Sequence, residues 1–154
     1  MSPMRKLILV MLLVLAPAVA RADVGIGFFL GEPTGLDLKV GLAPRSGLDI
    51  LFGVTGYRDG YRDVSYGHVT YLVTPFVGRG SSVLVPLRLG IGGAIYGDSN
   101  NIAAAVRVPL ELALRFRSAP IEIYGEFAVA LILARLGNED RIDLQGGVGL
   151  RFYF

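Results

Sequence analysis

The only histidine of the chain, His68, lies close in sequence to Ser65 and Asp63. A serine hydroxyl beside an imidazole that acts as general base is a common unit of ester hydrolysis, and a carboxylate can orient the imidazole. These residues define one candidate chemistry, hydrolysis of a lipid ester with His68 as the base. Three common polar residues near a turn also occur without any catalytic role. We therefore predict that the protein is not an enzyme and keep the hydrolase as the alternative.

Other chemistries lack the side chains that they need. The chain has no cysteine, which excludes disulfide frameworks and thiol nucleophiles, and a single histidine does not make a transition-metal cluster. We predict no metal and no other cofactor. The net charge of +2 depends on Arg5, Lys6 and Arg21, because without them 12 basic residues stand against 13 acidic ones. The sequence therefore does not predict nucleic acid as a partner.

Residues 1–22 have the order of a secretory signal peptide. Arg5 and Lys6 give a positive start, residues 7–20 form an apolar run, and the small residues Ala20 and Ala22 end the segment. The apolar run is too short for a membrane-spanning helix, which needs about 20 residues. We predict export from the cytoplasm, cleavage before Asp23, and one mature domain over residues 23–154.

The mature chain repeats one pattern, in which apolar and polar residues alternate between clusters of Gly, Pro, Asn, Asp and Ser. The connections are too short for crossover helices, so strands that are neighbours in sequence must pair antiparallel. The predicted strands are 24–31, 35–43, 47–57, 66–76, 83–97, 101–116, 121–133 and 141–154.

The two faces of these strands differ in chemistry. One face is apolar and carries no charge, whereas the other holds charged residues such as Asp143 and Arg151 together with many glycines. Glycine gives space inside a crowded lumen but has no use on a water-facing surface, so we place the charged face inside. The sequence therefore predicts an all-β fold, an eight-stranded antiparallel up-and-down transmembrane barrel of the outer membrane. A soluble lipocalin-like binding barrel remains an alternative.

Several segments also carry a resemblance to known proteins. They resemble a family of small outer-membrane β-barrels whose fold is similar to the OmpA transmembrane domain and OmpX, over essentially all of residues 24–154. The segments are Gly31-Glu32-Pro33-Thr34-Gly35, Gly90-Ile91-Gly92-Gly93, Arg107-Val108-Pro109 and the ending 146–154. The resemblance implies contact with outer-membrane lipids, and it implies that the assembly machinery reads the last strand through Phe152 and Phe154. We expect a monomer.

Charged residues on the inward face predict the contents of the lumen. A tight turn at 117–120 would place Arg115 opposite Glu122 and Glu111 opposite Glu126, with other charges on diagonal positions. We predict a ring that fills the lumen, made of Arg88, Glu111, Arg115, Glu122, Glu126 and Arg151. The alternative is that these charges only hydrate a polar lumen.

The filled lumen and the modest loops favour one class of function. We expect a non-enzymatic integral barrel that contributes to envelope integrity or surface interaction. A narrow pore for small solutes is the alternative for a membrane barrel whose lumen holds a continuous path of water.

Overall fold

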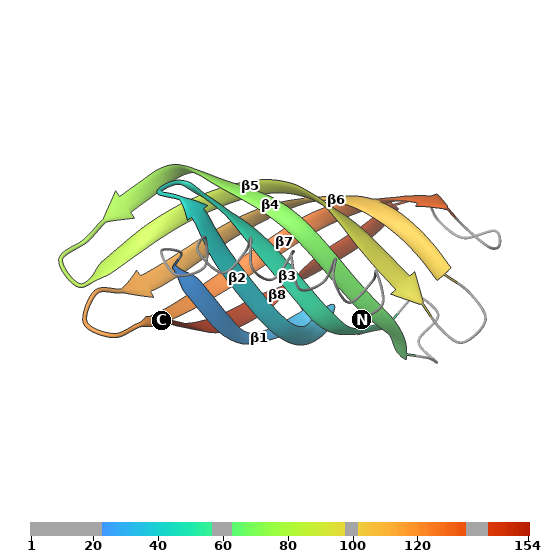
Figure 1. The fold of residues 1–154 in the computed structure, drawn as a ribbon, viewed down its shortest axis with the longest axis horizontal. Coiled ribbons are helices and arrows are strands. Elements are labelled where there is room, and N and C mark those ends of the chain that lie inside the picture. Colours follow the sequence, from blue (N-terminus) through green and yellow to red (C-terminus); the bar gives the residue numbers. More distant parts are fainter. Residues whose placement is uncertain (1–22, 57–62, 98–101, 135–141) are drawn as a thin grey trace, which may run out of the picture.

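Eight β-strands form one closed antiparallel barrel in the computed structural model (Figure 1). Each strand pairs with its neighbours in sequence, and β1 also pairs with β8, which closes the sheet. The strands are β1 (Val24–Glu32), β2 (Thr34–Ala43), β3 (Ser46–Gly56), β4 (Asp63–Arg79), β5 (Val83–Gly97), β6 (Ile102–Phe116), β7 (Ile121–Ala134) and β8 (Ile142–Tyr153). The predicted fold class and strand order are confirmed.

The structure describes residues 23–56, 63–97, 102–134 and 142–154. The predicted signal peptide, residues 1–22, and its cleavage point therefore lie outside the described residues or at their edge. Within these ranges, no helix combines the length and the apolar character that crossing a membrane requires.

Strand β4 is longer than predicted at both ends. We expected it over 66–76, with a turn from 77 to 82, because Gly78, Gly80 and the serines at 81 and 82 are turn-forming residues. The structure continues the strand to Arg79 through a register shift between Val73 and Phe76, so Pro75 sits in a bulge. Within the shifted stretch, the amide of Thr74 donates to the carbonyl of Arg45 at 2.8 Å. The bulge thus tolerates a proline within a strand.

The barrel has a charged interior and an apolar exterior. Leu110 and Ile123 are 44% and 45% exposed, whereas the residues beside them, Glu111 and Glu122, are completely buried. The register of β6 and β7 pairs Glu111 with Glu126 and Arg115 with Glu122, as the tight turn predicted. The placement of the apolar face outside is therefore confirmed.

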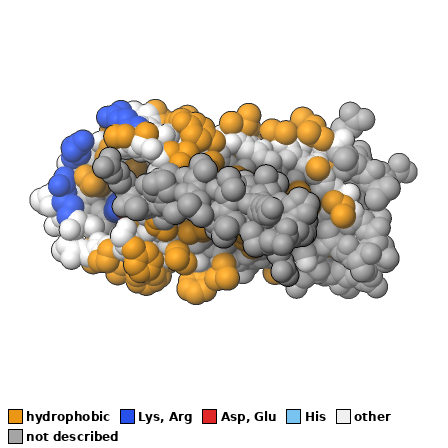
Figure 2. Space-filling view, in the orientation of Figure 1, with side chains coloured by type: hydrophobic (Ala, Val, Ile, Leu, Met, Phe, Trp, Pro, Cys, Tyr) orange, Lys and Arg blue, Asp and Glu red, His pale blue; other side chains and the backbone are white. Residues whose placement is uncertain are grey.

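Three short connections and both ends of the barrel chain lie at one end of the molecule. The β2–β3, β4–β5 and β6–β7 connections lie toward the left of Figure 1, as does the C-terminus. Gly25 of β1 pairs with Tyr153 of β8, which places both ends of the barrel chain there. We call this the turn end. Figure 2 shows basic side chains gathered at it and hydrophobic side chains along the flanks of the barrel.

The Gly-Glu-Pro-Thr-Gly segment forms the β1–β2 turn at the opposite end. The Glu32 carboxylate accepts hydrogen bonds from the Thr55 hydroxyl at 2.6 Å and from the Gly56 amide at 3.0 Å. The Thr34 hydroxyl donates to the Gly31 carbonyl at 2.8 Å, and Gly31 has a φ of 154°, which favours glycine. The turn therefore ties β1 and β2 to the end of β3.

Glycines on the inward face allow strands to approach closely. A Cβ on Gly27 would lie 1.8 Å from the backbone oxygen of Leu150, and one on Gly53 would lie 1.9 Å from that of Thr34. These contacts involve backbone atoms, which cannot rotate away. The close approach of these strands therefore depends on glycine at these positions.

We predict that Gly27→Ala destabilises the barrel by about 1 to 3 kcal/mol, the usual range for forced overpacking. Urea unfolding of the purified protein in detergent would measure the loss. Gly125→Ala is the matched control, because a Cβ there would meet nothing closer than 3.8 Å. Equal stability of the two variants would contradict a tight approach at Gly27.

Candidate functional site: the charged lumen

Arg151 of β8 lies at the centre of the lumen and is completely buried. Its Nε donates to Asp37 at 2.5 Å, and its two Nη atoms donate to carboxylates from three further strands. These contacts are to Asp49 at 2.7 Å, Glu122 at 3.0 Å, and Glu111 at 3.0 and 3.1 Å. One guanidinium therefore connects strands on opposite sides of the barrel.

Arg88 of β5 completes a closed cluster with Arg151. It donates to Glu111, and it holds both oxygens of Glu122, at 2.9 and 2.7 Å. Each of the two glutamates therefore lies between the two arginines. The Tyr153 hydroxyl adds a hydrogen bond of 2.9 Å to Glu122. Opposite charges therefore alternate in this cluster. Buried ions are tolerated when they are paired in this way.

Arg107 of β6 forms the second cluster, toward the end opposite the turn end. It donates to Glu126, to the Thr70 hydroxyl at 2.9 Å and to the Gln145 side-chain oxygen at 3.2 Å. Asp49 links the clusters, since one of its oxygens contacts Arg151 and the other lies 3.0 Å from His68 Nε2. Polar contacts thus run along the lumen without a break between the clusters.

The predicted ring of six is only partly reproduced. Arg88, Glu111, Glu122 and Arg151 do contact one another, but Glu126 pairs with Arg107 instead. Arg115 is also outside the ring, because it pairs with Asp23 at the turn end and lies over the Tyr153 ring at 3.9 Å. The register placed these residues on the correct face, but it did not determine which side chain reaches across the lumen.

Several contributors were missed by the sequence analysis. Asp37 and Asp49 come from β2 and β3, far from Arg151 in the chain, and Arg107 of β6 was not among the six residues of the predicted ring. Tyr124 of β7 supports the centre, since Arg151 lies over its ring at 3.6 Å and its hydroxyl donates to Asp37 at 2.5 Å. The sequence signal that could have identified them is the alternation along each strand, which places them on the inward face.

Aromatic rings lie against inward glycines. Tyr124 pairs with Gly149 across β7 and β8, and a Cβ on Gly149 would come within 2.5 Å of the Tyr124 ring. Gly25 similarly faces the Tyr153 ring, and a Cβ on Gly25 would lie only 3.0 Å from that ring. The glycines therefore provide the space in which the rings that carry Arg151 and Arg115 are held.

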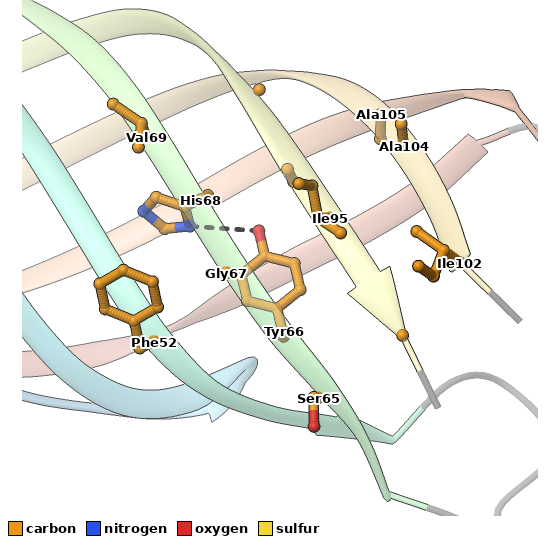
Figure 3. A pocket seen from close by; sticks show the side chains of 13 residues that line it. Phe52, Ser65, Tyr66, Gly67, His68, Val69, Ile95, Ile102, Ala104 and Ala105 are labelled. Carbon is orange, nitrogen blue, oxygen red and sulfur yellow. Dashed lines mark hydrogen bonds between the residues drawn. The ribbon is translucent and has the colours of Figure 1, made fainter. Parts of the chain in front are cut away.

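His68 is part of the polar network rather than of a Ser–His pair. Its Nε2 lies 3.0 Å from Asp49, and its Nδ1 lies 3.1 Å from the Tyr66 hydroxyl. Figure 3 shows the contact between His68 and Tyr66. Ser65 belongs to β4 rather than to a loop, and it is exposed on the outward face while His68 is buried. The side chain of Asp63 lies outside the described part. Among the described residues, the structure therefore brings no serine hydroxyl to the imidazole.

Comparison with known proteins identifies a similar fold but no family. No family model matches the chain, and no curated protein matches it in sequence. The N-terminal β-barrel domain of Pseudomonas aeruginosa OprF superimposes with a TM-score of 0.57 at 11% identity, covering 86% of this chain and 96% of that one. Ail, the attachment invasion locus protein of Yersinia pestis, gives a TM-score of 0.45 at 16% identity over 86% of this chain and 97% of its own. The likeness to the OprF domain confirms the predicted barrel fold.

We predict that Arg151→Ala destabilises the barrel by about 3 to 5 kcal/mol, because it leaves buried carboxylates without their counter-charge. Thermal melting in detergent and the gel shift between unheated and heated samples would measure the effect. Arg117→Ala, which removes an exposed arginine at the turn end, should change stability by less than about 0.5 kcal/mol. Similar melting of wild type and Arg151→Ala would show that the network does not hold the barrel together.

Proposed function

We propose that the chain is an integral outer-membrane β-barrel with a lumen filled by side chains. The observation that carries this proposal is the reversal of polarity across the wall. Phe52, Leu133 and Val148 are 67%, 64% and 59% exposed, while Arg107, Glu111 and Arg151 are completely buried. An apolar surface that surrounds a whole domain is unfavourable in water and favourable against acyl chains.

Closure of the sheet supports the same placement. A membrane interior offers no water to unpaired backbone groups, so a strand-built span must have no free edge. The pairing of β1 with β8 meets this requirement. The outer wall is also hollowed where Gly67, Gly93 and Ala104 carry little side chain, in a mostly apolar cavity of about 830 Å³ that a lipid chain would fill (Figure 3).

The turn end supports a periplasmic orientation. Arg45, Arg79 and Arg117 are exposed there, next to the apolar wall. Basic residues at the edge of an apolar belt lie at the level of anionic lipid headgroups. Short turns and both chain ends on the periplasmic side are typical of bacterial outer-membrane barrels. The predicted signal peptide would bring the chain to that compartment.

The contents of the lumen support a non-enzymatic, non-conducting role. Eight strands enclose an interior just wide enough for side chains, and here Arg88, Arg107 and Arg151 occupy it, each paired with a buried carboxylate. His68 has both ring nitrogens engaged by buried groups. We therefore propose a contribution to envelope integrity or to surface interaction, by a monomer surrounded by outer-membrane lipids.

Membrane fractionation followed by gel electrophoresis tests the class of protein. We expect the protein in the outer-membrane fraction, extracted only with detergent, and migrating differently before and after heating because the closed barrel resists unfolding. Recovery from the periplasm without detergent would instead indicate a soluble binding barrel.

The last strand provides a test of assembly. Phe154 is 81% exposed, so Phe154→Ala should leave the stability of the barrel refolded in detergent unchanged. We expect its amount in the outer membrane to fall several-fold, because the assembly machinery would read this terminal aromatic residue. Leu133→Ala, an exposed apolar residue at the other end of the barrel, is the matched control. Equal amounts of the two variants in the membrane would contradict a role of Phe154 in assembly.

A further inference from the structure

A cavity of about 240 Å³ opens inside the barrel at the turn end. Its lining includes three basic side chains, Lys39, Arg88 and Arg115, together with Asp23 and Tyr153. The remaining walls come from β2 to β5 and are mostly apolar or glycine. This volume is several times the roughly 30 Å³ that one water occupies in the liquid, so it has room for a ligand group of several heavy atoms.

Lys39 is the unusual member of this lining. It is only 8% exposed, yet it makes no hydrogen bond or ion pair of 4 Å or less to any residue in the described ranges. A buried ammonium without a partner is unfavourable, because it loses hydration and gains no counter-charge. All the other buried basic side chains of the described part have carboxylate partners. Lys39 therefore has unused capacity to bind an anion.

The nearby carboxylates are already saturated. Asp49 lies directly across from Lys39 in the register of β2 and β3, which makes it the natural partner. Its two oxygens instead contact Arg151 and His68. Glu111 and Glu122 are each held by Arg88 and Arg151. The same contacts that fill the middle of the lumen thus leave Lys39 facing the cavity.

We propose that this cavity binds a phosphate group, with the Lys39 ammonium as the main ligand and Arg115 as the second. Arg115 is 29% exposed and pairs with Asp23, whose side chain is 48% exposed at the opening. An entering anion can take the place of this exposed carboxylate on the Arg115 guanidinium. An ammonium and a guanidinium together supply several donors in different directions, which suits a tetrahedral oxyanion.

The phosphate can come from two sources, free inorganic phosphate or the headgroup of a phospholipid. The cavity lies inside the barrel but opens at the end that carries the exposed arginines, within reach of either. Its existence does not depend on the membrane placement proposed above. Failure to bind phosphate would therefore leave that placement untouched.

Calorimetric titration of the detergent-purified protein tests the proposal, in a non-ionic detergent that contains no phosphate. One arm adds inorganic phosphate and the other adds short-chain phosphatidylglycerol. We expect saturable binding in at least one arm, and the arm with the tighter binding identifies the source. Lys39→Gln should weaken that binding at least tenfold, whereas Lys39→Arg should largely retain it. Arg117→Gln, which removes an exposed charge from the same end outside the cavity, should bind like wild type.

A second measurement does not depend on the folding of any variant at this site. Lys39 is the only lysine after residue 22, so reductive methylation with a ¹³C label gives it a resolved NMR signal. We expect this signal to shift on addition of the ligand that binds in the titration. The proposal is overturned if neither ligand binds saturably, if Lys39→Gln binds as wild type does, or if the Lys39 signal does not move at saturation.

Discussion

The structure depends on the pairing of charges that are shut away from water. The interior of this barrel holds a cluster of apolar and aromatic side chains that includes Phe29, Leu51 and Tyr96, but it also encloses many charged side chains whose pairing must contribute to its cohesion. Arg151 contacts four carboxylates from four other strands, and Arg88 and Arg107 hold further ones. Because an isolated buried ion is costly while a paired one is tolerated, these contacts act together, and the lumen is ordered as a unit.

Aromatic residues and glycines make this pairing possible. The Arg151 guanidinium lies over the Tyr124 ring, and that ring stacks on Phe29 with 5.7 Å between centroids. The ring occupies the space that Gly149 leaves open on the next strand. On neighbouring strands, a large inward ring thus faces a glycine. This arrangement fixes the position of Arg151 along the lumen. Glycine on the charged face therefore indicates the positions of rings as well as the close approach of neighbouring strands.

The sequence predicted the wall of the barrel better than its contents. Strand parity and turn length depend on neighbouring residues, so they gave the strand order, the inward face and the pairing of Glu111 with Glu126. They could not predict that Arg151 reaches Asp49 across the lumen, because a register relates adjacent strands only. The length of β4 was wrong for a local reason, since a bulge accommodates Pro75. Of the predicted ring, the residues nearest the middle contact one another, while Arg115 lies too close to the turn end.

The distribution of charge along the lumen separates two kinds of space. In the middle, long arginine side chains from different strands converge, and Asp37, Asp49, Glu111, Glu122 and Glu126 each contact a guanidinium there. Toward the turn end, Gly41 and Gly47 replace large side chains, and Lys39, the only lysine after residue 22, makes no direct ion pair with a described residue. A network that satisfies its own charges has little affinity for a ligand, since binding would break existing pairs. Recognition of a small anion within this barrel is therefore confined to the mouth, where an unpaired cation and free volume occur together.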